Sequence, residues 1–184
     1  DQRQHIELTR DLGQRFNTKY KEVFTIPEAH IIKALAKIND LQEPTAKMSK
    51  SAASMAGVIE LLDAPEVTLK KFKSSVTDAG REVKFDSSEK AGISNLLTIH
   101  SAFSGKSISD LENEFAGKGY GDFKVAVAEV VIAALDPIRK RTEELMNDKG
   151  QLLKILKDGA DKANAVANKT LAETYSALGL ISHG

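Results

Sequence analysis

The chain has 184 residues, 41% of them hydrophobic, which is enough for one core or for one core and part of a second. Its 26 basic and 26 acidic residues cancel, so any contact with nucleic acid has to come from local basic patches. The absence of cysteine excludes disulfides and thiolate metal sites and suits a cytoplasmic location, and the absence of any apolar run near the roughly 20 residues of a membrane span makes a membrane partner unexpected.

The front of the chain predicts one helix and one strand. From residue 2 to residue 16 the apolar side chains fall mostly four positions apart, at Ile6, Leu8, Leu12 and Phe16. The short apolar run Val23–Ile26, ended by Pro27, predicts a buried or edge strand. Because this helical pattern begins at once and the first residue is not methionine, we expect the chain to be part of a longer protein.

The middle of the chain predicts a long loop and a helix. Residues 39–54 are polar, contain Pro44 and follow neither the helical nor the strand period, so they predict a loop of the length that is usually functional in compact domains. A helix is expected from about Ala64 to Val76, begun by a capping box of Asp63 and Glu66. An irregular, charged connection follows over residues 77–89.

The rest of the chain is helical by its periodicity. Four segments are expected, at residues 93–103, 107–115, 122–146 and 152–178. Gly105 ends the first, Ser107 and Asp110 cap the second, and Pro137 is expected to kink or split the third. The fold class is therefore mainly α.

Residues 47–51 of the long loop read Lys-Met-Ser-Lys-Ser. Two ammonium groups three positions apart, alternating with hydroxyls, suit a polyphosphate, because they can neutralise the charge that builds on a leaving pyrophosphate. The same residues also fit a solvated surface loop. Residue types alone leave both interpretations open.

The order of several segments adds a resemblance. Residues 47–51 resemble the signature loop of the class I aminoacyl-tRNA synthetases, and their surroundings are similar to the tryptophanyl-tRNA synthetase family. The similar segments are Asp1-Gln2, His5, Arg10–Leu12, Phe24–Ala29, Ser75–Asp78, Gly92–Leu97 and Gly117–Gly121. The family's His-Ile-Gly-His-type motif, which faces ATP from the other side, is absent. The resemblance covers nearly the whole chain and implies that it is a C-terminal fragment.

This resemblance implies a division of the fold. Residues 1–55 would be the C-terminal remnant of a Rossmann catalytic domain with the lysine loop, and residues 56–148 an all-helical, anticodon-binding domain. Residues 149–184 would form a C-terminal helix that packs back toward the catalytic part. The full-length enzyme would be a homodimer.

The resemblance also implies an activity, in which tryptophan reacts with ATP to form the aminoacyl-adenylate and is then transferred to tRNA(Trp). Lys47 and Lys50 would be the catalytic residues that hold the ATP phosphates, and Mg²⁺ would travel with those phosphates. The other expected contacts are hydrogen bonds from Ser49 and Ser51, adenine contacts from the backbone near Met48 and the main chain of Ile38, and ribose and tryptophan contacts from Asp1 and Gln2. This chain alone is expected to be inactive.

Two other interpretations stay open. The chain could be a non-catalytic helical module that binds tRNA, or a fragment of the similar tyrosyl enzyme. Two basic stretches, Arg139-Lys140-Arg141 and Lys70, Lys71 and Lys73, could contact tRNA phosphates or could be solvated helix surface. The four histidines do not have the spacing of metal ligands, so no metal site in protein ligands is expected.

Overall fold

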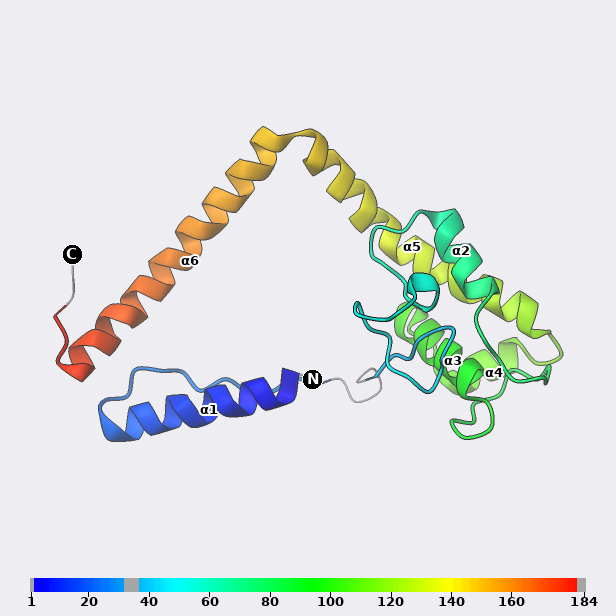
Figure 1. Ribbon diagram of the computed structural model, residues 1–184, viewed down its shortest axis with the longest axis horizontal. Coiled ribbons are helices and arrows are strands. Elements are labelled where there is room, and N and C mark those ends of the chain that lie inside the picture. The colour runs from blue at the N-terminus through cyan, green and yellow to red at the C-terminus, as the bar shows by residue number, and fades with distance from the viewer. Residues whose placement is uncertain (1, 32–36, 182–184) are drawn as a thin grey trace. The chain divides into compact units, whose positions relative to one another are not determined.

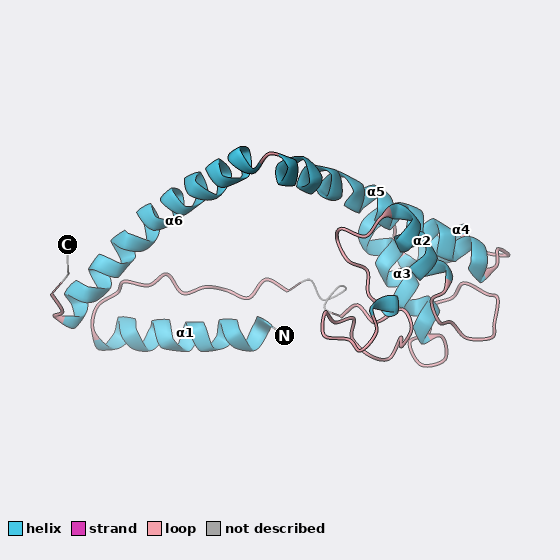
Figure 2. Cartoon of the chain, turned by 45° about the horizontal axis from the view of Figure 1, so that its top comes forward, coloured by secondary structure: helices cyan, strands magenta, loops and turns pink. Residues whose placement is uncertain are grey.

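The computed structural model describes residues 2–31 and 37–181, and within them the chain consists of helices and loops (Figures 1 and 2). The mainly α fold class is thus confirmed. The helices in chain order are α1 (Gln2–Lys19), the short 3₁₀ helix η2 (Met55–Gly57), α2 (Pro65–Lys73), α3 (Ala91–Ser104), α4 (Ile108–Glu114), α5 (Tyr120–Asn147) and α6 (Lys149–Leu178).

The chain divides into two compact units. One is Ile32–Glu144, and the other joins Asp1–Ile31 to Leu145–Gly184. The first unit contains η2, α2, α3, α4 and most of α5, and the second contains α1 and α6. These limits do not coincide with the domain boundaries expected at residues 55 and 148, and the Rossmann and anticodon-binding assignments stay predictions.

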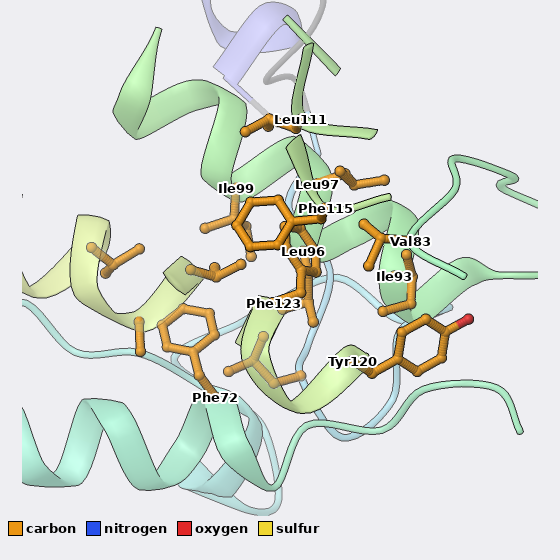
Figure 3. Packing of buried hydrophobic residues seen from close by; sticks show 14 residues of the cluster. Phe72, Val83, Ile93, Leu96, Leu97, Ile99, Leu111, Phe115, Tyr120 and Phe123 are labelled. Carbon is orange, nitrogen blue, oxygen red and sulfur yellow. The ribbon is translucent and has the colours of Figure 1, made fainter. Parts of the chain in front are cut away.

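The core of unit Ile32–Glu144 forms around α3. Ile93, Leu96 and Leu97 are at most 1% exposed, and Figure 3 shows them among the aromatic side chains of the core. Phe115 and Phe123 meet edge to face there, with ring centroids 4.9 Å apart, an arrangement that aromatic pairs favour. Helix α3 is therefore the most firmly packed element of this unit.

Two helix starts were predicted from capping residues, and one prediction is confirmed. Ser107 is the N-cap of α4, and its Oγ accepts a hydrogen bond from the backbone N–H of Asp110. The capping box at Asp63 is wrong, because Ala64 is the N-cap of α2 and makes no side-chain cap. The Asp63 carboxylate instead binds Lys71 Nζ at 2.7 Å, since both side chains are largely buried and each neutralises the other.

The strand predicted at Val23–Ile26 is also wrong, because no strand forms among the described residues. The segment is extended, but a strand needs a neighbouring strand to satisfy its backbone. Here the side chain of Asn17 on α1 takes part of that role: its Oδ1 accepts from Val23 and Phe24 N–H, and its Nδ2 donates to Phe24 O.

Pro137 lies inside α5, which continues to Asn147. A split at the proline is therefore excluded. The missing amide of a proline removes one hydrogen bond, and packing of the preceding turns outweighs that loss here.

Candidate functional site

The Lys-Met-Ser-Lys-Ser segment begins where the chain turns back on itself. Asn39 and Lys47 form an isolated antiparallel bridge. Met48 N–H donates to Ile38 O and Asp40 N–H donates to Ala46 O, both at 3.0 Å. The long loop is therefore closed at its base, and the first lysine of the segment lies at that closure.

The turn inside this closure is held by the buried carboxylate of Asp40. Its Oδ1 accepts from the backbone N–H groups of Gln42 at 2.7 Å and Glu43 at 3.1 Å. Gly57 packs against the same carboxylate so closely that a Cβ atom at this position would lie 1.7 Å from Oδ1. Position 57 therefore requires glycine for the Asp40 cap to form.

A side chain of helix α3 also binds this segment of the chain. The side chain of Asn95 accepts from Asn39 N–H through Oδ1 and donates to Asn39 O through Nδ2, both at 2.9 Å. Leu41, which is 2% exposed, adds backbone hydrogen bonds to Gly57 and Val76. Residues 39–41 are thus fixed to three separate parts of the unit.

The rest of the Lys-Met-Ser-Lys-Ser segment is more exposed to solvent. The side chains of Lys47 and Lys50 are exposed. Ser49 and Ser51 share a hydrogen bond between their Oγ atoms at 3.0 Å, and Ala52 N–H donates to Ser49 O. This arrangement leaves two exposed ammonium groups and two hydroxyls on one short stretch, which is suited to an anionic ligand.

Ile38 and Met48 also share an apolar surface. Together they line one side of a groove of about 450 Å³. Its other walls come from α2, α3 and α5 and the segment before α2, with Phe72, Phe103 and Leu135 among the lining residues. The backbone pair that closes the loop therefore rests on the helical core of the same unit.

Comparison with known proteins shows the family of this chain. The family model for tRNA synthetases class I (W and Y) matches residues 1–136, which include the closed loop and α2 to α4. The chain belongs to the tryptophanyl-tRNA synthetase family. It is 50% identical over 181 residues to tryptophan–tRNA ligase 2 of Streptomyces avermitilis and 52% identical over 180 residues to tryptophan–tRNA ligase of Bacillus anthracis. Each match covers 98% of this chain and 54% of the relative, so the chain spans about half the length of these relatives.

Solved structures of this family have the same fold. The chain aligns with tryptophanyl-tRNA synthetase from Mycoplasma pneumoniae at a TM-score of 0.86 and 37% identity, over 99% of this chain and 56% of that one. It aligns with the enzyme from Campylobacter jejuni, crystallised with ADP and tryptophan, at a TM-score of 0.66 and 31% identity. That second match covers 97% of this chain and 55% of the other.

The structure brings together some of the residues that the family resemblance singles out. Ile38 and Met48 are hydrogen-bonded, Lys47 lies at the bridge, and Ser49, Lys50 and Ser51 follow directly. Gln2 lies at the exposed start of α1 in the other compact unit. Asp1 lies outside the described residues. Neither Asp1 nor Gln2 is therefore placed relative to the loop.

Sequence reasoning missed the residues that hold the loop, namely Asp40, Gly57 and Asn95. Asp40 carried a usable signal, because an aspartate followed by a polar turn often caps its own backbone. Asn95 lies in the family-like segment Gly92–Leu97, but its partner Asn39 is 56 positions away. No local pattern predicts such a contact.

The basic stretch on α5 is paired internally. Arg139 binds Asp136 at 2.6 Å and Glu143 at 2.7 Å. The neighbouring Lys140 and Arg141 bind Asp136 and Glu144, at 2.6 and 2.9 Å. These ion pairs favour the solvated-helix interpretation over a site for tRNA phosphates, because each cation already faces a carboxylate.

The lysines of α2 separate into two kinds. Lys71 is largely buried and donates to Val58 O at 2.8 Å as well as to Asp63, so it is structural. Lys70 and Lys73 are exposed, together with the neighbouring Ser74. Of the three lysines in this stretch, only Lys70 and Lys73 are therefore placed where they could contact RNA.

The histidines are the remaining titratable candidates. In residues 2–31 and 37–181, no three histidine or acidic side chains gather in a way that could hold a metal ion. His100 is buried in the core, where its ring stacks on Phe123, and burial lowers the pKa of this imidazole.

Within residues 2–31 and 37–181, no helix is long and apolar enough to cross a membrane.

Proposed function

We propose that the chain takes part in the activation of tryptophan by ATP and in its transfer to tRNA(Trp). Lys47 and Lys50 bind the ATP phosphates and stabilise the charge on the departing pyrophosphate, and Ser49 and Ser51 donate hydrogen bonds to the same groups. Any Mg²⁺ would be carried by the ATP phosphates themselves. Asp1 and Gln2 bind the ribose and the tryptophan head group.

One observation carries the proposal. Met48 N–H donates to Ile38 O at 3.0 Å, so the two segments to which the family resemblance assigns the adenine contacts lie side by side. Lys47 and Lys50, both exposed, lie on either side of Met48 in the sequence. Adenine contacts beside an exposed cationic loop are the arrangement that a nucleoside triphosphate requires.

The remaining parts of the proposal concern the whole enzyme. The segment up to about residue 55 belongs to a Rossmann catalytic domain, and the helices that follow bind the anticodon side of the tRNA. The full-length protein is a cytoplasmic homodimer. The exposed Lys70 and Lys73 on α2 are the basic side chains of that stretch that can contact RNA phosphates.

Titrations of the 184-residue chain with ATP and with adenosine test the phosphate contacts and the adenine contacts separately. Each ligand is titrated while the amide NMR signals of Met48 and Ser49 are followed. Lys47→Ala or Lys50→Ala should weaken ATP binding by about tenfold, because a charged hydrogen bond is lost, and should leave adenosine binding unchanged. Lys154→Ala, which removes an exposed lysine of α6, serves as the matched control.

An ATP titration that leaves the Met48 and Ser49 signals unmoved would exclude the proposed site. A loss of ATP and adenosine binding in equal measure would instead show that the lysines act on the fold of the loop. Only a loss confined to ATP supports phosphate binding.

The chain alone should not catalyse tryptophan-dependent exchange of pyrophosphate into ATP. In-line attack at the α-phosphate requires the nucleotide to be fixed from both sides, and the described residues supply the lysine side. Robust exchange by the purified 184-residue chain would contradict this expectation. The assay measures incorporation of labelled pyrophosphate into ATP with and without tryptophan.

A further inference from the structure

Asn95 makes a pair of contacts that its own helix does not need. It lies in the second turn of α3, and its amide reaches out of the helix to both backbone groups of Asn39. An asparagine that satisfies the N–H and the C=O of one residue replaces a neighbouring strand at that point. Asn95 is 7% exposed, so these hydrogen bonds are largely shielded from water.

The helix that carries Asn95 is fixed. Its neighbours Ser94 and Leu96 are also buried, and Leu96 points into the core shown in Figure 3. Gly92 allows the start of α3 to approach the preceding segment closely, because a Cβ there would lie 2.2 Å from Val76 O. The Asn95 amide is therefore presented by a rigid support.

The contact lies next to the signature segment. Asn39 is bridged to Lys47, and the residues on either side of Asn39 donate to or accept from the returning chain. If Asn39 moves, the Ile38–Met48 hydrogen bond and the position of Lys47 move with it. The Asp40 cap shapes the turn itself but does not attach it to α3.

We propose that Asn95 is a positioning residue that clamps the base of the Lys-Met-Ser-Lys-Ser loop to α3 and so sets the place from which Lys47 meets the nucleotide. The role in nucleotide binding rests on the proposed function; the clamp itself does not. Asn95 acts through its two hydrogen bonds with Asn39.

The test compares Asn95→Ala with Thr98→Ala in the 184-residue chain. Thr98 lies one turn further along α3, and its Oγ1 donates to Ser94 O within the same helix, so its removal costs a side-chain hydrogen bond that does not involve the loop. Amide hydrogen exchange is measured without ligand at Asn39, Met48 and Val127, the last of which reports on the core of α5. ATP binding is then titrated with each variant.

Asn95→Ala should speed exchange at Asn39 and Met48 by about tenfold or more, since two buried hydrogen bonds are lost, and should leave Val127 unchanged. Affinity for ATP should fall with it. Thr98→Ala should change neither. Asn95→Asp, which keeps the shape and the acceptor but places a carboxylate against Asn39 O, should loosen Met48 while Asn39 keeps part of its protection.

The outcomes separate the two proposals. If the wild-type chain binds ATP and Asn95→Ala alters neither Met48 exchange nor affinity, the clamp is wrong. If the wild-type chain does not bind ATP, the proposed function fails, and the clamp is decided by exchange at Met48 alone. Should Asn95→Ala unfold the unit, as loss of protection at Val127 would report, Asn95→Asp decides: unchanged Met48 exchange in that variant overturns the clamp.

Discussion

His100 is a titratable side chain placed inside the aromatic core. Its ring stacks on Phe123 at a centroid distance of 6.0 Å and meets Phe115 edge-on, while Nδ1 lies 3.1 Å from Ser104 Oγ. Glu114 and Lys106 act on the imidazole with opposite signs, and burial is the larger effect, so the pKa of His100 is lowered. The folded state therefore favours the neutral form of this ring.

This predicts a loss of stability in mild acid. The unfolded chain takes up a proton on His100 as the pH falls below about 6.5, whereas the folded chain resists it, so the free energy of unfolding should decrease as the pH falls through that value. His100→Phe should flatten that part of the profile. Denaturant unfolding followed by circular dichroism measures both. A His100→Phe profile as steep as the wild-type profile would contradict the assignment.

The carboxylates act in a different window. The pKa of Glu112 is lowered by its hydrogen bond from Lys84, and the pKa of Asp136 is lowered by its hydrogen bonds from Lys140 and Arg139. Such groups stabilise the folded state only above their own ordinary pKa values near 4, so they lose their effect below the range in which His100 titrates. The two effects can be separated by pH.

Gly57 allows a close approach at the candidate site. Gly57→Ala would place Cβ against the Asp40 carboxylate and should destabilise the chain by about 1–3 kcal/mol. Gly121→Ala is a matched control, because a Cβ there meets nothing within 4 Å and alanine favours the helix. Denaturant midpoints measure both changes.

A double-mutant cycle tests the cause. If the clash with Asp40 is responsible, Asp40→Ala should cost less in the Gly57→Ala chain than in the wild type. Additive costs would show that the two residues act independently.

At the scale of single elements, α4 depends on its cap. The helix runs only from Ile108 to Glu114, so propensity alone cannot hold it, and the Ser107 hydroxyl satisfies one of its free N–H groups. Ser107→Ala should lower stability by about 1 kcal/mol, whereas Ser109→Ala, on the exposed surface of the same helix, should be nearly neutral. Equal effects of the two substitutions in denaturant melts would rule out the cap.

The helices were predictable because their signals are local. Gly105 stands in a left-handed conformation with φ of 72°, and Ser107 caps the next helix, so both boundaries were readable from residue type. The strand predicted at residues 23–26 does not form, because apolar residues before a proline indicate an extended chain but not whether a neighbouring strand will pair with it. The capping box predicted at Asp63 is wrong for a similar reason. The Asp63 carboxylate forms an ion pair with Lys71, eight positions further on, instead of capping the helix.

The candidate site was half predictable. Lys47, Met48 and Lys50 were identified by their types and by resemblance, and the structure places them at a closed loop. The supporting contact from Asn95 crosses 56 positions of sequence and depends on how α3 packs. The residues that present charge were thus visible in the sequence, and those that hold the backbone were not.

At the scale of the whole molecule, the two units differ in how much they bury. None of the residues of α1 or α6 is buried, whereas α3 is buried along most of its length. On α6, Leu153 is 66% and Val166 71% exposed. Few buried contacts give a low free energy of local opening.

We therefore expect amide exchange to be fastest in α6 and slowest in α3. Exchange of the intact chain, followed by mass spectrometry of peptides from each helix, measures this order. A chain that associates through its exposed leucines would show protection in α6 that rises with protein concentration. Equal protection of α3 and α6 at high dilution would contradict the prediction.

The backbone of the Lys-Met-Ser-Lys-Ser segment is held more firmly at Lys47 than at Lys50. The two lysines should therefore lose different amounts of conformational entropy when they bind a ligand. The backbone of Lys47 is already ordered by its bridge to Asn39, so a ligand that meets this side chain immobilises little more than the side chain itself. Lys50 lies in a turn that rests on Ser49, and fixing a backbone residue costs about 1–2 kcal/mol. Two identical side chains three positions apart thus start from different degrees of freedom, because a ligand has to immobilise only the side chain of Lys47 but both the side chain and part of the backbone of Lys50.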